Sequence, residues 1–452
     1  MGLKEKQMKF VKSLGIILLA ILFSIASLSY GQEKSPIITV LTNCDLIEGT
    51  GKPLMKNMTV VIEGNIIKEI KRGIYQQPPG KMNVRVFDLE GGYILPGLWN
   101  MHVHLSDLLP DVHDMLGHEP TLPAAIRAGR NAMDALKRGF TGLRMVGERD
   151  YIDIAWRDAF DAGIFLGPRI YASGKVVTPT EGDPSEPGWP VEIYADGPDE
   201  IRKAVLENIK RGIDLVKIFA PPLQEDEMAT IIRLAHSQGL KVTAHAGGKS
   251  AHRAVVAGVD CIEHGTMISD ETIQLMAEKG VFLCPTVVCN LSEEYIRERE
   301  DRLAKLGFSD EKGVVGGRTL VAYADERSPR VAARHREIIV KAANTGVKIL
   351  SGSDSNPLGE LGLLEIEQLF LSGLTEMQAL IAATRNCAEM CGVLDKLGTI
   401  EEGKLADLIV VAENPLENIS NLRKLKMVFK DGKPVNLTKD EGQTSFWELY
   451  FK

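Results

Sequence analysis

Apolar residues along this chain recur with two periods, and the two periods alternate through most of its length. Short runs rich in Val, Ile and Leu predict strands, because strands buried on both faces are nearly continuous in apolar residues. Eight such runs are Tyr93–His104, Thr141–Val146, Arg169–Ala172, Leu215–Phe219, Val242–Ala246, Cys261–His264, Phe282–Pro285 and Ile349–Asp354. Segments with helical periodicity, such as "DEIRKAVLENIKRG" and "EDEMATIIRLAHSQG", separate most of them and end in the glycine that often follows a helix.

Strands that alternate with helices in this way predict an α/β protein built on a (β/α)8 TIM barrel. The alternative with the same pattern is an open doubly wound sheet. Such a sheet normally carries a glycine-rich phosphate-binding turn after its first strand, whereas the first run here ends in histidines. The pattern therefore favours the barrel.

The two ends of the chain have a different texture. Residues 37–72 contain short alternating runs broken by glycine turns, which predict small antiparallel β structure. The same texture returns near the end in "GKLADLIVVAENPL" and "LKMVFKDGKPV". The barrel pattern is thus flanked on both sides by β segments.

The first residues predict a signal peptide. Four lysines precede the apolar run from Leu14 to Ala26, and the small residues of Ser29-Tyr30-Gly31 then lead into a polar segment. A retained membrane anchor is the alternative, although the apolar run is short for a membrane span. We expect a mature chain that begins near Gln32 and is exported, either periplasmic or secreted.

Composition narrows the classes of partner. The 452 residues are 44% hydrophobic and 25% charged, as in a globular protein, and the formal net charge is −8. Residues 1–31 are net basic, so the mature chain is more acidic still, and it shows no basic stripe for nucleic acid. The six cysteines form no C-x-x-C pattern, and we expect no essential disulfide.

Candidate chemistry lies at the carboxyl ends of the predicted strands, which is where active sites of such barrels form. Imidazoles two residues apart share one face of a strand and can bind one metal ion. Each of these residues alone could be an ordinary core or turn residue, but together they predict a shared metal site. They are His102, His104, Lys217, His245, His264 and Asp354.

Motifs in the same order give the chain a family resemblance. It resembles the amidohydrolase superfamily, in the branch near imidazolonepropionases and the prolidase-like Xaa-Pro dipeptidases, over nearly the whole mature chain. The stretches that carry the resemblance are "ILPGLWNMHVH", "GFTGLR", "DLVKIFA", "VTAHA", "CIEHG", "GSDS" and "LGTIEEGKLADLIVV". The resemblance implies a metal-bearing barrel beside a small β-sandwich that both chain ends build. The implied divisions are a signal peptide at 1–31, a composite sandwich at 32–92 and 398–440, and a barrel at 93–397.

The resemblance also implies roles for the six residues. His102 and His104 would hold the first metal together with Asp354, and His245 and His264 would hold the second. Lys217, carboxylated by carbon dioxide, would bridge the two ions, which are expected to be zinc because the ligands are nitrogen and oxygen. A water between the metals would become hydroxide near neutral pH, with Asp354 as the general base.

The sequence departs from the family pattern at positions near the expected substrate. The segment "SGKVVTPTEGDPSEPGWPVE" lacks a histidine that many relatives carry, as does "SDSNPLGELGLLE", and "LRMVGE" lacks an aspartate after the arginine. Acidic residues gather between Thr180 and Glu200, either as a solvated loop or as a preference for cationic substrates. Residues 288–330 form a charged insertion, which is either a lid over the barrel mouth or surface helices.

These patterns predict an exported, metal-dependent amidohydrolase that hydrolyses a C–N bond of a small amide, with an Xaa-Pro or Xaa-Arg dipeptide as the expected substrate. A cyclic-amide hydrolase or a deaminase on the same fold is the first alternative. Deaminases of the superfamily generally use one metal and no bridging lysine, so Lys217 argues against them. A catalytically dead periplasmic binding protein is the second alternative. The expected partners are a small molecule or dipeptide and further copies of the chain in a homo-oligomer, without a stable membrane span after signal cleavage.

Overall fold

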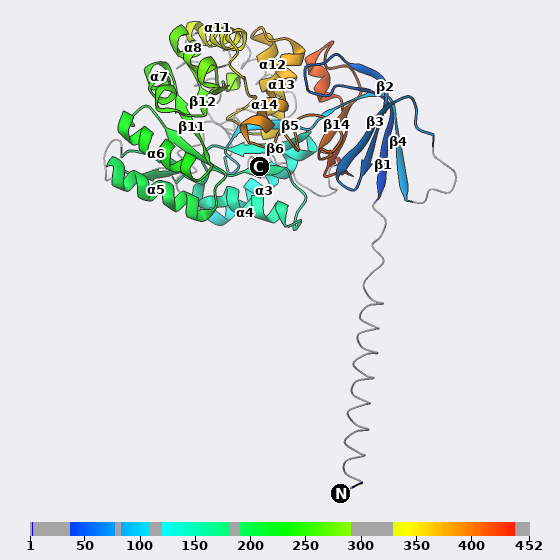
Figure 1. Ribbon diagram of the computed structural model, residues 1–452, viewed down its shortest axis with the longest axis horizontal. Helices are drawn as coiled ribbons and strands as arrows, with labels where there is room; N and C mark the ends of the chain where they lie inside the picture. Colours follow the sequence, from blue (N-terminus) through cyan, green and yellow to red (C-terminus); the bar gives the residue numbers. More distant parts are fainter. Residues whose placement is uncertain are drawn as a thin grey trace, which may run out of the picture.

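The computed structural model shows an α/β fold in which helices surround parallel strands and a further sheet lies to one side (Figure 1). Apart from Gly2, the described residues are 37–76, 83–107, 120–180, 190–290 and 329–438. The expected signal peptide therefore lies, except for Gly2, outside the described residues. None of the helices in the described ranges is both long enough and apolar enough to cross a membrane.

Within the described ranges, both chain ends contribute to one seven-stranded mixed sheet. Its strands, in spatial order, are β16 (Lys433–Pro434), β15 (Leu425–Lys430), β14 (Leu408–Val411), β4 (Val84–Pro96), β1 (Ile38–Leu46), β2 (Met55–Glu63) and β3 (Ile66–Arg72). The antiparallel pairing of β14 with β4 joins the two ends, and Val60, Ile94 and Leu408 are buried in a core of their own against this sheet. Both ends thus contribute strands to one sheet, and each contains the β structure that the sequence predicts.

The expectation of one strand over Tyr93–His104 is wrong. The apolar run divides at Gly97 into β4, which ends at Pro96 in the seven-stranded sheet, and β5 (Leu98–Val103), which lies in a parallel sheet. A Cβ atom on Gly97 would lie 2.1 Å from the Thr141 side chain, so only glycine permits this close passage. Periodicity could not reveal the division, because the run stays apolar on both sides of it.

The parallel strands form two sheets in the part of the chain that the structure describes. One has the order β5, β6 (Phe140–Met145) and β7 (Arg169–Tyr171). The other has the order β13 (Phe282–Cys284), β12 (Cys261–His264), β11 (Lys241–Ala246), β10 (Leu215–Phe219), β8 (Val176–Thr178) and β9 (Glu192–Tyr194). The short strands β8 and β9 were not predicted.

Backbone hydrogen bonds connect the two sheets on one side, and connect β5 to the run Ile349–Asp354 on the other. Asp214, just before β10, donates from its N–H to the carbonyl of Ala172, just after β7, over 2.7 Å. On the other side, Met101 of β5 donates to the carbonyl of Ser351 over 2.8 Å. The run Ile349–Asp354, expected as an eighth strand, forms only an isolated parallel bridge between Ile349 and Leu283 among the described residues.

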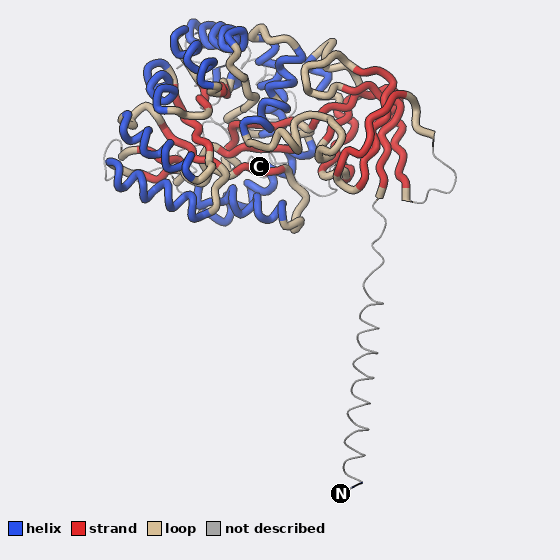
Figure 2. The backbone as a smooth tube through the Cα atoms, viewed as in Figure 1, coloured by secondary structure: helices blue, strands red, loops and turns tan. Residues whose placement is uncertain are grey.

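Helices cover the outside of the parallel strands (Figure 2). Among them, α5 ends at a glycine in the left-handed conformation, as the sequence predicts, and α7 and α8 end in the same way. The described helices are α3 (Thr121–Lys137), α4 (Ile152–Asp161), α5 (Gly197–Arg211), α6 (Glu225–Ser237), α7 (Gly248–Ala257), α8 (Asp270–Lys279), α11 (Pro329–Thr345), α12 (Leu358–Leu371), α13 (Glu376–Ala382) and α14 (Arg385–Met390). Short 3-10 helices are η1 (Arg149–Tyr151), η2 (Val287–Asn290) and η4 (Ile419–Arg423).

An ion cluster fastens the seven-stranded sheet to the parallel strands. Arg169 on β7 donates to the buried carboxylate of Asp407, with 3.0 Å between Nε and Oδ2, and also bonds Asp431. The N–H of Asp431 donates to the other oxygen of Asp407 over 2.8 Å. The carboxylate of Asp407 therefore has a partner on each layer.

Candidate metal centre

His102 and His104 meet at one carboxylate. His102 lies on β5 and His104 directly follows it, and their rings are 5.6 Å apart between centroids. The Nε2 atom of each lies close to Oδ1 of Asp354, at 3.2 Å and 3.3 Å respectively. The sequence prediction that the two imidazoles face one site together with Asp354 agrees with this arrangement.

Asp354 is placed by its backbone. Its N–H donates to the carbonyl of His102 over 2.9 Å, and its φ is +50°, in the left-handed region. Asn100 holds the residue before it, because its Oδ1 accepts the N–H of Ser353 and its amide donates to the Ser353 hydroxyl. Because Asn100 and His102 are both on β5, this one strand positions the histidine and also the backbone before Asp354.

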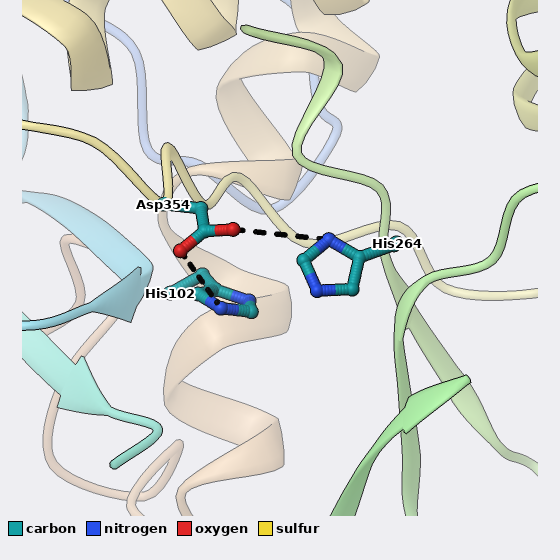
Figure 3. A group of neighbouring side chains, drawn as sticks. All are labelled: His102, His264 and Asp354. Carbon is teal, nitrogen blue, oxygen red and sulfur yellow. Dashed lines mark ion pairs between the residues drawn. The ribbon is translucent and has the colours of Figure 1, made fainter. Parts of the chain in front are cut away.

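His264 and His245 approach from the neighbouring strands β12 and β11. Their rings are 4.4 Å apart, and the ring of His264 is 4.9 Å from that of His102. Figure 3 shows His102 and His264 beside different oxygens of Asp354, with 3.9 Å between Nδ1 of His264 and Oδ2 of the aspartate. One ligand atom from each of His102, His264 and Asp354 lies within 4.8 Å of the others, which is close enough to share a metal ion.

Lys217 lies on β10, next to β11, and only 4% of its side chain is exposed. Burial lowers the pKa of its amine, and the negative charges of Glu263 and Asp354 offset this effect only in part. Within the described part of the chain its amine makes no hydrogen bond or ion pair. A buried amine without a partner is costly as an ammonium and favourable as a neutral nucleophile.

The pKa values of the ligand candidates follow from burial and from their neighbours. Burial lowers the pKa of His245 to about 3, with help from the charge of Lys217, and lowers that of His264 well below its usual value. Burial also opposes protonation of His104, but the hydrogen bond and charge of Asp354 raise its pKa to about 9. Burial alone would raise the pKa of Asp354, yet His102 and His104 hold it well below its usual value. An anionic carboxylate among mostly neutral imidazoles is a donor set suited to a dication.

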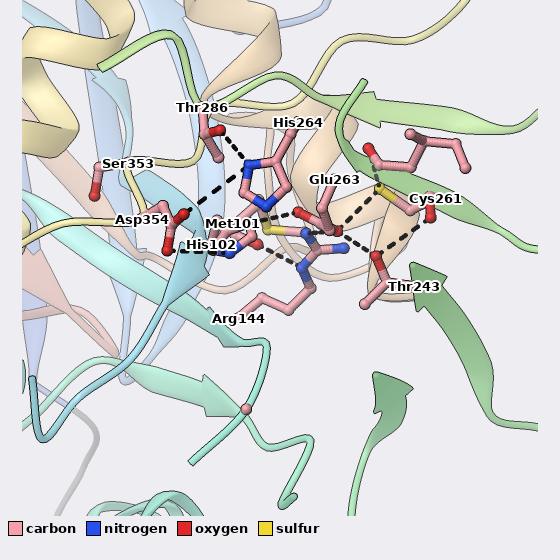
Figure 4. A network of polar contacts seen from close by, with 12 residues as sticks. Met101, His102, Arg144, Thr243, Cys261, Glu263, His264, Thr286, Ser353 and Asp354 are labelled. Atoms are coloured by element: carbon pink, nitrogen blue, oxygen red, sulfur yellow. Dashed lines mark hydrogen bonds and ion pairs between the residues drawn. The ribbon is translucent and has the colours of Figure 1, made fainter. Parts of the chain in front are cut away.

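A fully buried polar network lies behind these residues (Figure 4). Glu263 on β12 accepts from Nδ1 of His102 through Oε2 over 2.8 Å. Its other oxygen accepts from Arg144 of β6 over 2.5 Å and from the hydroxyl of Thr243. The charge of Arg144 holds the pKa of Glu263 well below its usual value, although burial acts in the opposite direction.

Sequence reasoning missed several residues that shape this site. Glu263, Asn100 and Arg144 stand in the recognised motifs, but nothing in their spacing indicates their partners. His335 of α11 donates from Nε2 to the carbonyl of His264 over 2.7 Å, and the thiol of Cys289 lies 3.6 Å from Oδ2 of Asp354. In the sequence, His335 stands in a helical segment and Cys289 in an apolar run, and neither context indicates a place near the site.

Two predicted features of the site entrance lie largely outside the described residues. The charged insertion is described only up to Asn290 and again from Pro329. Of the acidic loop, residues 181–189 are likewise outside, while Glu192, Asp196 and Glu200 are described. The predictions of a lid and of a preference for cationic substrates therefore remain predictions.

Comparison with known proteins gives the class that this fold and site belong to. Residues 93–435 match the model of the Amidohydrolase family, and the chain belongs to that family. It is accordingly a hydrolase that acts on carbon–nitrogen bonds, as the sequence predicts.

Individual relatives agree with this assignment. The chain is 28% identical over 445 residues to ochratoxinase from Aspergillus niger, covering 88% of this chain and 86% of that protein. A crystal structure of a Xaa-Pro dipeptidase with bound methionine in the active site superposes with a TM-score of 0.73 at 30% identity, covering 88% of this chain and 99% of the other. Imidazolonepropionase from Sphingopyxis alaskensis is 29% identical over 192 residues, which are 41% of this chain and 38% of that one. The resemblance to the imidazolonepropionase and prolidase-like branch is confirmed.

Proposed function

We propose that the chain is an exported, metal-dependent dipeptidase that hydrolyses Xaa-Pro or Xaa-Arg dipeptides. The observation that carries the proposal is the convergence of His102, His104 and His264 on the single carboxylate of Asp354. The Xaa-Pro dipeptidase that superposes over 99% of its length supports the substrate class. The apolar and basic pattern of residues 1–31 supports export.

The proposed architecture is a closed (β/α)8 barrel over residues 93–397 beside a composite β-sandwich of residues 32–92 and 398–440. Closure is supported by the Asp214–Ala172 hydrogen bond between the two parallel sheets and by the Met101–Ser351 hydrogen bond between β5 and the run Ile349–Asp354. The pairing of β14 with β4 supports the composite domain. Active sites of such barrels form at the carboxyl ends of the strands, where these histidines lie.

The donor set fits two divalent ions, and we propose zinc. His102, His104 and Asp354 would hold the first ion and His245 and His264 the second, with Lys217 between them. The Nε2 atoms of His102 and His104, at 3.2 Å and 3.3 Å from Oδ1 of Asp354, support the first of these sites. Bound there, the ions would supply Lewis-acid polarisation of the scissile carbonyl and a more acidic water.

Lys217 would bind both ions as a carbamate. Carbon dioxide adds to the neutral amine, a N–C bond forms, and one proton leaves, so that an anionic group replaces a potential ammonium. Burial without a hydrogen-bonding partner among the described residues supports this change, because an ammonium there would lie beside two dications.

Asp354 would carry the proton. Its carboxylate accepts a proton from the attacking water as the C–O bond forms, and returns it to the nitrogen as the C–N bond breaks. The hydrogen bond from its own N–H to His102 and the Ser353 anchor on Asn100 keep the carboxylate aimed at the same point throughout. The products are a free carboxylate and a free amine.

A hydrolysis screen tests this proposal. The full mature chain, supplied with zinc and bicarbonate, should release amino acids from Xaa-Pro or Xaa-Arg dipeptides, and Asp354→Asn should lower kcat by at least about a thousandfold, since both proton transfers are lost. Glu225→Gln, at an exposed position on α6, serves as the matched control and should leave kcat unchanged. Activity confined to cyclic amides or to release of ammonia from amino-substituted rings would favour the two alternatives on the same fold. Zinc binding without any hydrolysis would favour the binding protein.

A further inference from the structure

Within the described part of the chain, Glu263 hydrogen-bonds both the metal-ligand candidate His102, on the ring nitrogen that faces away from Asp354, and Arg144, on a strand of the other parallel sheet. It lies on β12, and no part of its side chain is exposed. Oε2 accepts from Nδ1 of His102, and Oε1 accepts from Arg144 on β6. The proposed function uses neither Glu263 nor Arg144, although both are completely enclosed.

We propose that Glu263 is a positioning residue that selects the tautomer of His102, and that Arg144 keeps Glu263 able to do so. This inference rests on the proposed metal site. A carboxylate has only acceptors, so Nδ1 of His102 must carry the hydrogen in their 2.8 Å contact. The lone pair of the neutral ring then lies on Nε2, the atom that faces Asp354.

The other partners of Glu263 fix how its two oxygens are used. The guanidinium of Arg144 has only donors, and one of them is directed at Oε1 over 2.5 Å while its Nε is held by the carbonyl of Met101 over 2.6 Å. The hydroxyl of Thr243 also donates to Oε1. Oε1 is therefore saturated with donors, and Oε2 is left for His102.

The same geometry makes the effect of an amide predictable. In Glu263→Gln, Arg144 requires an acceptor, so the amide oxygen takes the place of Oε1 and the amide nitrogen takes that of Oε2. The NH2 group then faces Nδ1 of His102 and selects the tautomer with its hydrogen on Nε2. That nitrogen can no longer bind a metal without losing its proton or the hydrogen bond behind it.

Arg144 provides the matched variant. Arg144→Met breaks the same buried pair but leaves the carboxylate, so His102 keeps the tautomer with its hydrogen on Nδ1. Both single variants should lose stability, because each leaves one uncompensated partner in the core. Only Glu263→Gln should weaken zinc binding, by about tenfold to a hundredfold in Kd. The double variant Arg144→Met with Glu263→Gln removes the demand for an acceptor, lets the amide turn its oxygen toward His102, and should recover most of the affinity.

The experiment measures zinc Kd by competition with a chromophoric chelator in the presence of bicarbonate, alongside the melting temperature of each metal-free variant. Glu227→Gln is the control, because among the described residues this carboxylate on α6 accepts hydrogen bonds from the N–H groups of Gln224 and Gly197 and from no metal-ligand candidate. The zinc Kd of this variant should match that of the unaltered chain. An unaltered chain that binds no zinc would refute the proposed metal site itself. An unaltered chain that binds zinc, with equal Kd values in Glu263→Gln and Arg144→Met, would overturn this inference alone.

A second comparison covers the case in which Glu263→Gln gives no folded protein. In the background of Arg144→Met, glutamine and leucine at position 263 differ in whether an acceptor remains for His102, while both lack the charge. The glutamine double variant should bind zinc at least about tenfold more tightly than the leucine double variant. Equal affinities would show that Glu263 only fills space, and would overturn the inference.

Discussion

The N–H of Asp354 donates a hydrogen bond of 2.9 Å to the carbonyl oxygen of His102. The two side chains return to one another as well, with 3.2 Å between Nε2 of His102 and Oδ1 of Asp354. His102 is the first of the ligand candidates in the sequence and Asp354 is the last. One backbone hydrogen bond holds them together, although 251 other residues separate them in the sequence. Such preorganisation means that little order has to be created when the site is used.

Replacement of Lys217 by alanine should lower the zinc content of the purified chain from about two ions toward one or none. Activity should fall by several orders of magnitude, because the proposed bridge between the two ions would be lost. Added acetate or propionate should restore part of both by supplying a carboxylate. Elemental analysis alongside a kinetic assay measures this. Lys210→Ala, at an exposed position on α5, is the control, and two tightly bound ions with near-normal kcat in Lys217→Ala would contradict the bridged pair.

Asp407→Asn should destabilise the chain by about 2 kcal/mol, since the neutral amide leaves Arg169 and the nearby Lys430 without their shared buried partner. Chemical unfolding of the metal-free protein measures the change. The exposed pair of Lys68 and Glu63 gives the comparison, and Glu63→Gln there should cost less than about 0.5 kcal/mol. Equal effects of the two substitutions would show that the ion cluster does not fasten the sheets together.

Glu365 predicts a pH dependence of stability. Burial raises the pKa of this α12 carboxyl to about 8, although the N–H groups of Val287 and Val288 donate to it and favour its charge. Its pKa is therefore higher in the folded than in the unfolded chain, so the folded state binds more protons between about pH 4.5 and pH 8. Its contribution to stability is fully present below that range and is lost as the pH rises through it, by at most about 1.4 kcal/mol per pH unit.

Glu365→Gln removes this titration. The melting temperature of the variant, relative to the unaltered chain, should therefore rise steadily from pH 5 to pH 8 when both are measured without metal. Glu225→Gln, whose side chain is exposed, should follow the unaltered chain at every pH. Melting curves of Glu365→Gln that stay parallel to those of the unaltered chain would show that Glu365 is already ionised throughout.

The N-terminal pattern predicts that the exported protein begins near Gln32. The basic residues and apolar run should be removed by a signal peptidase after the small residue Gly31. Intact mass measurement and N-terminal sequencing of the secreted or periplasmic fraction determine the start. An intact Met1 or Met8 in a membrane fraction would instead identify the segment as a retained anchor.

The sequence was most informative where one residue type stands out at a strand end. His102, His104, His245 and His264 could be located because histidine is rare and each follows an apolar run. Asp354 of the eighth run lies beside His102 and His104, although the run forms no strand among the described residues and only Ile349 pairs there as a β-bridge. Strand order follows from alternation with helices, which explains why the parallel topology was predictable.

Contacts between distant strands could not be predicted in the same way. The pair of Arg144 and Glu263 depends on which side chains two strands turn toward each other, and the sequence contains no period that specifies it. The division of the first run at Gly97 was hidden because β4 and β5 are both apolar near the break, although they belong to different sheets. The division depends instead on a residue distant in the sequence, because the Thr141 side chain packs against Gly97.

The pairing of β4 with β14 sets an order for synthesis and folding. Residues 93–96 find their partners only at residues 408–411, so during translation the β4 edge stays unpaired on that side until most of the chain has been made. An unpaired apolar edge is a template for other chains, and closing so long a loop is slow. Nascent chains that stop before β14 should therefore be recognised by chaperones or aggregate, whereas chains that extend past β15 should not. The chain can therefore complete this sheet, and lose its exposed apolar strand edge, only after β14 and β15 have left the ribosome.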